Sequence, residues 1–402
     1  MAFRIAVSGL RAATADLDVT GNNIANASTT GFKSSRAQFA DVYASSNLGT
    51  SKDAIGQGVQ LSKVAQQFTQ GNVSFTDNSL DLAINGQGFF VVEDQEGRFY
   101  TRAGAFGLDK DGYVVNATGQ RLLGFQSLNG QVTGATGPLQ VDTVSLAPQP
   151  TQGIDVQVNL DAGSVAPTSA FSIADPSSYN NATSLTVFDS LGEEHLATMY
   201  FRKTVGNTWG SYLYVDGVAT AGGTNPATMT FDNSGNLTSA ANNAFGSVAV
   251  ATGAANLTLG VEFTGTTQFG ADFGVNALGQ DGYTTGRLSG IDIDTQGVVL
   301  ARFGNGETAP QGQVMLANFG NPQGLQPIGD TLWTESSESG PPLAGAPGTA
   351  ALGLVQSGAL EESNVDLAQQ LVNMIIAQRN FQANAQVIRA EDEVTQTIIN
   401  IR

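Results

Sequence analysis

The chain has 402 residues, 41% of them hydrophobic and 8% aromatic, which is enough to form the cores of two or three domains. Seventeen basic and 35 acidic side chains give a net charge of −18, which argues against nucleic acid and anionic membrane surfaces as partners. The absence of cysteine excludes disulfides, thiolate metal ligands and cysteine nucleophiles.

The sequence predicts neither membrane insertion nor a cleaved signal peptide. No run approaches the roughly 18 apolar residues that mark a transmembrane helix. Arg4, Arg11, Asp16 and Asp18 interrupt any apolar stretch of a secretory signal. These features alone indicate a cytoplasmic protein.

The first predicted element is a helix from about Arg4 to Ala27, after which Gly31 can take the left-handed closing position. All twelve prolines lie between Pro138 and Pro347, so both ends of the chain lack the strongest helix breaker. Two rows at a seven-residue spacing, three residues apart, fall on one helix face. The rows are Phe3, Leu10, Leu17 and Ile24, and Ala6, Ala13, Thr20 and Ala27.

From about residue 71 the pattern changes to short alternating runs such as Gly88–Val92, His195–Phe201 and Trp209–Val215. Pairs of turn residues separate these runs, and both residues of such a pair can adopt the positive φ of a tight hairpin. The pairs are Asn85-Gly86, Asp111-Gly112, Asn129-Gly130, Asp216-Gly217, Asp281-Gly282 and Asn305-Gly306. The middle of the chain is therefore predicted to be antiparallel β.

Glycine, serine, threonine and asparagine are enriched from about 145 to 280, which suggests a second β domain inserted into the first. The predicted fold class is α+β, with terminal helices in a coiled-coil-like layer and two mainly antiparallel β domains. The predicted parts are an N-terminal helix and linker (1–70), a first β domain in two pieces (71–144 and 285–357), the inserted domain (145–284) and a C-terminal helix (358–402).

The last predicted element is a helix that runs to about Asn400. Ser363 is its predicted N-cap, with Asp366 three residues on as an acidic variant of the capping box. A row with the same seven-residue interval follows, until Thr395 interrupts it. This row is Leu367, Met374, Phe381 and Ile388.

The N-terminal helix needs a partner to be stable. Burial of the four residues in its first row would contribute about 6 to 12 kcal/mol in total. Ordering about 24 residues costs about 1 to 2 kcal/mol each in backbone entropy alone. We therefore expect a free N-terminus to be largely disordered, and to fold against the C-terminal helix of its own chain or against the ends of neighbouring subunits. The residues leave these two alternatives open.

Candidate catalytic residues are few. The single histidine, His195, begins a predicted strand, and no Gly-x-Ser-x-Gly elbow accompanies it, so a structural role is favoured. Asp292 and Asp294 share one strand face and could form an acid–base pair, although strands often expose such residues to solvent. We predict no catalytic residue and no enzyme activity.

No metal or cofactor site is predicted either. An acidic residue followed within a few positions by glycine recurs, as in Asp111-Gly112-Tyr113 and in 232–235 and 294–298, which could suggest calcium loops. An EF-hand requires glutamate six residues after the glycine, and Thr118 has that position after Gly112, so hairpin turns are favoured. Gly86-x-Gly88 does not complete a dinucleotide or phosphate fingerprint.

The two ends of the chain carry long motifs. The N-terminal motif reads Ser8-Gly9-Leu10, then Asn22-Asn23-Ile24-Ala25-Asn26 and Thr30-Gly31-Phe32-Lys33. The C-terminal motif reads Ser363-Asn364-Val365-Asp366-Leu367, then Leu371-Val372-Asn373-Met374-Ile375 and Ala377-Gln378-Arg379-Asn380-Phe381-Gln382-Ala383-Asn384. Together they resemble the terminal signatures of the flagellar rod and hook family of bacterial axial proteins.

Within that family, the length, the stretch from Asp81 to Phe90 and the large insertion resemble the hook branch, with the distal rod branch as the alternative. The resemblance implies export without a cleaved signal peptide through the flagellar type III apparatus, which replaces the cytoplasmic expectation. It implies polymerisation outside the cell into a curved tube, with the helices as the inner layer, that transmits motor torque. The implied partners are other copies of the chain and the rod, hook-cap, hook-length ruler and hook–filament junction proteins.

We predict that the functional sites are assembly interfaces, in which apolar residues form the packed core and asparagines set the register. The residues concerned are Phe3, Leu10, Leu17, Asn22, Asn23, Ile24, Asn26, Leu367, Leu371, Met374, Phe381 and Ile388. A remote alternative is a secreted carbohydrate-binding or hydrolytic β protein, in which Trp209, Tyr212 and Tyr214 would line a groove.

Overall fold

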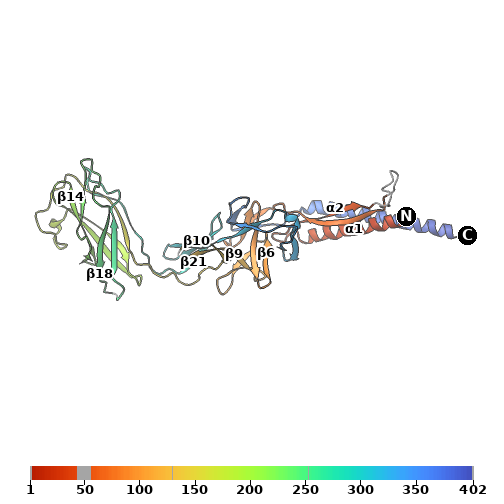
Figure 1. The fold of residues 1–402 in the computed structure, drawn as a ribbon, viewed down its shortest axis with the longest axis horizontal. Helices are drawn as coiled ribbons and strands as arrows, with labels where there is room; N and C mark the ends of the chain where they lie inside the picture. The colour runs from red at the N-terminus through yellow and green to blue at the C-terminus, as the bar shows by residue number, and fades with distance from the viewer. Residues whose placement is uncertain (1, 43–55, 129, 252, 401–402) are drawn as a thin grey trace. The chain divides into compact units, whose positions relative to one another are not determined.

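The computed structural model describes residues 2–42, 56–128, 130–251 and 253–400. It divides into two compact units, each treated by itself below (Figure 1). The first unit contains Met1–Asp142, Gly290–Ala301 and Ala309–Arg402, and the second contains Thr143–Ser289 and Arg302–Thr308. Because the first unit is made from separate segments of chain, the second is inserted into it. The predicted α+β class with nested β domains is confirmed, whereas the five-part division at the residues given above stays a prediction.

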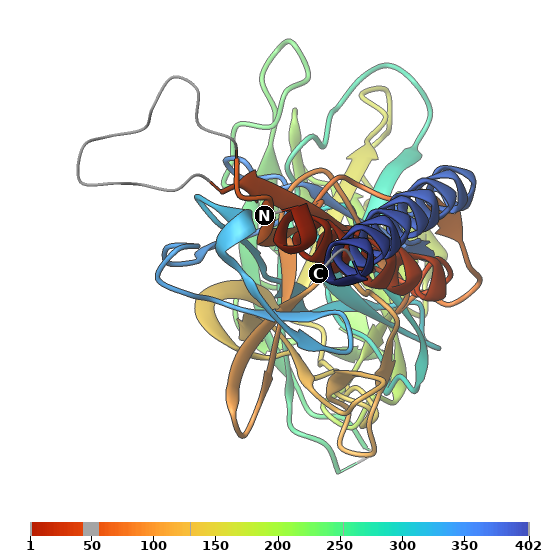
Figure 2. The ribbon, with the colours of Figure 1, turned by 90° about the vertical axis from the view of Figure 1, so that its right-hand side faces the viewer.

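The two terminal helices are α1, Ala2–Ala25, and α2, Leu367–Asn400. They pack side by side along their lengths (Figures 1 and 2). Asn23 is hydrogen bonded to Gln370, and a Cβ on Gly9 would lie 2.4 Å from Oδ1 of Asn384. Since a later residue of α1 faces an earlier residue of α2, the helices are antiparallel. The single chain thus supplies a partner for its own N-terminal helix. The disorder expected of a free N-terminus stays a prediction.

Small side chains form the contact between the helices. Ala6, Ala13 and Thr20 of the second predicted row are buried in α1, and Ala377 is buried in α2. Ala27, the last residue of that row, lies beyond the end of α1 and is partly buried. Phe3, by contrast, remains 49% exposed. Both rows have a seven-residue spacing and lie on one face of the helix, so the spacing does not show which row contacts α2. The row of small residues does, because it lets the two helix backbones approach closely.

The predicted N-cap of α2, Ser363, is wrong, because the helix begins later, at Leu367. Asp366 is the N-cap, because its Oδ1 accepts the N–H of Gln369 at 3.1 Å and its carbonyl accepts that of Gln370 at 2.9 Å. Ser363 lies outside the helix, where its hydroxyl accepts the N–H of Val365. At the other end, α1 stops at Ala25, so Gly31 does not close it.

The first unit also holds a two-stranded ribbon that packs along α1, and a main antiparallel sheet with the order β21-β22-β23-β9-β5-β6-β26-β25. Shorter pairs β28-β4 and β29-β3 join early and late segments of the chain. The ribbon is β1 (Ser35–Asp41) and β2 (Val59–Gln66). The remaining strands are β3 (Val73–Phe75), β4 (Leu82–Asn85), β5 (Phe89–Asp94), β6 (Gly97–Thr101), β7 (Phe106–Leu108), β8 (Val114–Asn116), β9 (Arg121–Leu128), β10 (Gln131–Pro138), β21 (Leu288–Ile293), β22 (Val298–Phe303), β23 (Thr308–Val314), β24 (Leu316–Asn318), β25 (Gln326–Gly329), β26 (Leu332–Thr334), β27 (Leu343–Gly345), β28 (Leu354–Ser357) and β29 (Ala359–Glu361). A short 3-10 helix, η2, spans Pro322–Gly324.

Aromatic rings pack edge to face in the core of this first unit. The ring centroids of Phe89 and Trp333 are 5.7 Å apart, and those of Tyr100 and Phe319 are 4.7 Å apart. Because Phe89 belongs to β5 and Trp333 to β26, these contacts join the two ends of the β region around one core.

The second unit is a β sandwich. One sheet has the order β16-β18-β19-β11-β20, and the other has β12-β13-β14-β15 with β17 beside β14. Inward side chains of both sheets, such as Val156, Phe201, Trp209 and Phe245, are fully buried in one core. The strands are β11 (Gly153–Asn159), β12 (Asn181–Phe188), β13 (Glu194–Lys203), β14 (Thr208–Val215), β15 (Val218–Ala219), β16 (Ala221–Gly222), β17 (Ala227–Thr230), β18 (Asn242–Val248), β19 (Leu257–Glu262) and β20 (Gly274–Gln280), with a 3-10 helix η1 at Pro176–Ser178.

One capped turn accounts for the recurring spacing of acidic residue and glycine. Oδ1 of Asp232 accepts the N–H groups of Ser234 and Asn236 at 2.8 Å, and Gly235 has a φ of 82°. These hydrogen bonds lower the pKa of Asp232. The same turn begins at Asp109, Asp189 and Asp294. These segments therefore form the turns that the sequence favours, in which the carboxylates accept hydrogen bonds from backbone N–H groups.

The predicted hairpin pairs have mixed outcomes. Asp216 and Gly217 both have positive φ, 48° and 78°, and connect the paired strands β14 and β15. Asn85-Gly86 is not a hairpin, because β4 pairs with β28 and not with β5. Asp281-Gly282 is not one either, since Oδ1 of Asp281 accepts N–H groups from 152–153. Asn129 lies outside the described residues.

Candidate assembly site

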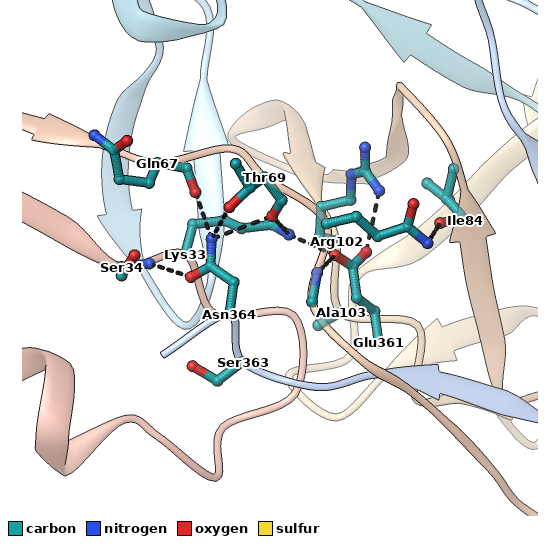
Figure 3. A network of polar contacts seen from close by, with 12 residues as sticks. Lys33, Ser34, Gln67, Thr69, Ile84, Arg102, Ala103, Glu361, Ser363 and Asn364 are labelled. Carbon is teal, nitrogen blue, oxygen red and sulfur yellow. Dashed lines mark hydrogen bonds and ion pairs between the residues drawn. The ribbon is translucent and has the colours of Figure 1, made fainter. Parts of the chain in front are cut away.

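A buried ionic cluster joins the terminal segments to the β region of the first unit (Figure 3). Glu361, at the end of β29, is completely buried between two cations. One carboxylate oxygen accepts from Nζ of Lys33 at 2.5 Å and from the N–H of Gly71 at 2.9 Å. The other accepts from Nη1 of Arg102 at 3.0 Å. We call Lys33, Arg102 and Glu361 the anchor cluster.

Burial of the anchor cluster away from water changes the pKa values of its basic side chains. Burial lowers the pKa of Lys33, and the negative charge of Glu361 opposes this effect. Burial likewise lowers the pKa of Arg102, against the same carboxylate. Two further donors are satisfied by backbone, because Lys33 also donates to the carbonyl of Thr69 at 2.8 Å and Arg102 to that of Gly86 at 2.7 Å. Nε of Arg102 is buried and has no hydrogen-bond partner among the described residues. Loss of Glu361 would leave both buried cations without their anion.

Asn364 extends the same junction toward α2. Its Oδ1 accepts the N–H of Ser34 at 2.7 Å, and its Nδ2 donates to the carbonyls of Gln67 and Thr69 (Figure 3). Three segments of chain therefore meet at one amide: the strand that leaves α1, the linker after β2, and the approach to α2.

Gly31 shows why the N-terminal motif contains glycine before Phe32-Lys33. Its φ is +69°, a conformation that other L-residues rarely adopt, and a Cβ there would lie 2.3 Å from the backbone nitrogen of Ala103. Its N–H donates to the carbonyl of Glu361 at 2.7 Å. Only glycine lets the chain lie this close to the β region.

The anchor cluster was not recognised as a site from the sequence, although Lys33 and Asn364 stand in the motifs quoted above. Lys33 and Glu361 are 328 residues apart, so no periodicity or local spacing connects them. The signal that could have found them is a lysine two residues after Gly31 in the N-terminal motif, together with an acidic residue just before the C-terminal motif.

The predicted interface residues of α1 have different environments. Leu10, Leu17 and Ile24 are partly buried, and Phe3 is half exposed. The predicted asparagines make polar contacts within the chain.

Asn23 is buried and acts as a clamp on β1. Its Nδ2 donates to the carbonyl of Ser35 at 2.7 Å, and its Oδ1 accepts the N–H of Ser35 at 2.8 Å. Asn26 donates to the carbonyl of Asn22 at 3.0 Å and accepts from the hydroxyl of Thr29, at the end of α1. Within one chain these residues end the helix and attach the ribbon.

In α2, Met374 and Ile388 are partly buried toward α1, whereas Leu367, Leu371 and Phe381 are exposed. A second apolar line runs along the side of α2 away from Ala377, and we call it the outer stripe. It consists of Val372, Ile376, Ala383, Val387, Ala390 and Val394, all of them exposed. An exposed apolar line of this length is characteristic of an interface.

Of the candidate catalytic residues, His195 and Asp294 have structural contacts within the chain. His195 is buried between two carboxylates, with Nδ1 2.6 Å from Asp216 and Nε2 3.3 Å from Asp189. Although burial lowers it, hydrogen bonds and charges of both aspartates raise the pKa of His195 overall. Asp294 caps a turn, as described above.

The groove that the carbohydrate alternative requires is not formed by its three aromatic residues. Trp209 is completely buried in the core of the second unit. Tyr212 lies on the other side of β14, where Phe171 stacks on it with ring centroids 3.7 Å apart. In the described part of the chain, no cluster of three or more His, Cys, Asp or Glu side chains could hold a metal ion, and no helix there is long and apolar enough to cross a membrane.

Four family models match segments of the chain, including both terminal helices and most of the inserted unit. The descriptions are "Flagella basal body rod protein" for residues 3–33, "Flagellar hook protein FlgE/F/G D1 domain" for 83–175, "Flagellar basal body protein FlaE D2 domain" for 159–283 and "Flagellar basal body rod FlgEFG protein C-terminal" for 356–401. Paired terminal helices, nested β units and these matches define a structural protein of the flagellar axis.

Among known proteins, the flagellar hook protein FlgE of Salmonella typhimurium is 39% identical over 417 residues, covering 100% of both chains, and that of Escherichia coli K12 is equally similar. FlgE of Rhizobium meliloti is 34% identical and covers 100% of this chain and 98% of its own. The chain belongs to the flagellar hook protein family, and it functions as a structural subunit of the hook. The crystal structure of Helicobacter pylori FlgE2 has the same fold, with a TM-score of 0.54 at 15% identity, over 72% of this chain and 100% of that one.

Proposed function

We propose that the chain polymerises through its terminal helices into a curved, flexible tube that transmits motor torque. The observation that carries this proposal is the outer stripe of α2, since α1 packs against the side of α2 that contains Ala377 and the residues of the stripe are exposed. Burial of each exposed valine or isoleucine against a neighbouring subunit would contribute about 1.5 to 3 kcal/mol before losses of entropy. The half-exposed Phe3 and the exposed Leu367 and Leu371 belong to the same proposed interface.

The anchor cluster suits torque transmission. Torque must pass from the helices to the β region, and the two are joined by a completely buried carboxylate with three donors. Such a junction is specific in geometry and costly to break. In the proposed tube the helices form the inner, stiff layer, and the acidic, polar β surfaces make wetter contacts that slide as the tube bends.

The proposal includes the environment of the tube. The subunit would be exported without a cleaved signal peptide by the type III apparatus and assembled outside the cell. Its partners would be other copies, the rod, the hook cap, the length ruler and the hook–filament junction proteins, with no catalytic step. The relatives reported above are hook proteins over their whole length, which favours the hook over the distal rod.

Electron microscopy of the concentrated full-length protein tests the proposal. We expect curved tubes; straight rods would support the distal rod alternative, and the absence of polymer at any concentration would contradict assembly by this chain alone. Ile376→Glu, in the outer stripe, should abolish tubes while the monomer stays folded. Gln382→Glu, an equal change of charge on an exposed residue that is not a helical neighbour of any residue in the proposed interface, should leave tubes intact.

A further inference from the structure

Helix α2 extends past the beginning of α1. Because Gly9 lies against Asn384 and Asn23 against Gln370, Ala2 lies level with about residue 391. Residues 392–400 therefore continue beyond α1 (Figure 1). At a rise of about 1.5 Å per residue, this extension is roughly 13 Å long. It carries exposed Val394 and Ile399, and we call it the overhang.

A groove lies on another side of α1, between that helix and the ribbon. Its volume is about 740 Å³, and its lining includes Phe3, Arg4, Val7, Arg11, Ala12 and Leu61. It extends from Phe3 to Ala15 of α1, which is roughly 18 Å along the helix. Phe3 and Leu61 are 49% and 39% exposed, so apolar surface faces solvent here.

Charge distinguishes the groove from the overhang. Arg4 and Arg11 line the groove, and neither has a carboxylate partner among residues that the structure describes. The overhang begins with Asp392 and Glu393, which likewise have no basic partner in the described ranges. Apolar and charged groups are thus complementary on two surfaces of similar length.

The overhang of one chain cannot enter its own groove, because α2 continues straight past the N-terminal end of α1 as one helix. We propose that the overhang docks in the groove of a second copy of this chain. Val394 then packs against the apolar floor near Ala12, and Glu393, the preceding residue of the helix, pairs with Arg11, the residue that precedes Ala12. This contact rests on the proposed assembly function and names the surfaces of one subunit-to-subunit contact. It is heterologous, and so it propagates from each subunit to the next.

Disulfide trapping between two full-length variants tests the contact, because the native chain has no cysteine. Ala12→Cys and Val394→Cys proteins are mixed, polymerised and oxidised. A covalent dimer should form from the mixture and from neither variant alone. Thr14→Cys, exposed on α1 outside the groove, replaces Ala12→Cys in the control and should give no dimer with Val394→Cys.

Tubes without the cross-link from the mixture, or with equal cross-linking from the Thr14→Cys control, would overturn the docking inference and leave the assembly function standing. Failure of the unmodified chain to form tubes would overturn both.

A second measurement does not depend on cysteine. Arg11→Glu and Glu393→Arg should each raise the critical concentration for assembly about tenfold, and their combination should restore it. Arg36→Glu, the same change outside the groove, should have a much smaller effect. Equal effects of Arg11→Glu and Arg36→Glu would overturn the inference.

Discussion

Replacement of Glu361 by glutamine should loosen the junction between the terminal helices and the β region. The side chain keeps its shape but loses the negative charge that lies between Lys33 and Arg102. The new amide also places N–H donors against groups that are themselves donors, because both carboxylate oxygens of Glu361 accept hydrogen bonds. Two buried cations are then left without an anion.

The magnitude follows from burial. Removal of one partner from a buried ion pair costs about 3 to 5 kcal/mol, and all three side chains are at most 5% exposed. Since about 1.4 kcal/mol corresponds to a factor of ten, the equilibrium constant for local opening should increase by at least about 100-fold. The affected strands are β29, which contains Glu361, and its partner β3.

Hydrogen exchange measured by mass spectrometry is the suitable assay, because it follows each segment separately. Amides of β3 and β29 should exchange about 100-fold faster or more in Glu361→Gln, while β13 of the second unit stays unchanged. Glu362→Gln alters an exposed neighbour and is the matched control. A loss of protection below tenfold, or one equal to that of the control, would refute the role of the anchor cluster.

Three further predictions concern glycine and histidine. Gly31→Ala should destabilise the first unit in urea unfolding by more than Gly340→Ala does. Both glycines have a φ near 70°, but only at Gly31 would the added Cβ meet backbone atoms. Equal losses of stability would show that close packing at Gly31 is unimportant. In α1, Gly9→Leu should weaken helix pairing through its clash with Asn384, whereas Gly21→Ala, with no atom near its Cβ, should stabilise the helix by about 1 kcal/mol; circular dichroism during thermal unfolding measures both. Because folding raises the pKa of His195 above 6.5, its ion pairs stabilise the second unit fully below that pH and are lost as the pH rises through the raised pKa. Urea unfolding of a Trp333→Phe variant, in which Trp209 is the remaining tryptophan, should therefore show by fluorescence a stability that falls with rising pH, and His195→Gln should remove that slope.

Elements with a strong local pattern could be predicted from the sequence. The runs beginning at His195 and Trp209 became β13 and β14 nearly unchanged, and Asp216-Gly217 made the expected tight turn. Asn85-Gly86 failed because a turn dipeptide does not say which strands pair. The preceding strand, β4, pairs with β28, about 270 residues later in the chain, and this pairing is determined by tertiary packing.

The candidate site was partly visible for the same reason. Periodicity shows that the terminal helices bury one face, but it cannot rank Ala13 above Leu10, since that order depends on how closely a second helix approaches. The anchor cluster has no periodic signal. Its geometry arises where Gly31 lies on the backbone of Ala103, a contact that exists only after the β region has folded.

The two partners that the sequence left open for the N-terminal helix are compatible with each other. Small residues, Ala6 and Ala13, bring α1 against α2 within one chain, and this pairing uses little of the apolar surface that either helix carries. The larger side chains, from half-exposed Phe3 to the outer stripe of α2, therefore remain for contacts with other copies. The pairing of the helices and the hydrogen bonds of Asn23 to Ser35 already offset the entropy cost of ordering α1. Each contact with a further subunit therefore buries apolar surface without a second entropy cost for ordering this helix. A preformed helical pair of this kind would allow subunits to join a growing tube one at a time.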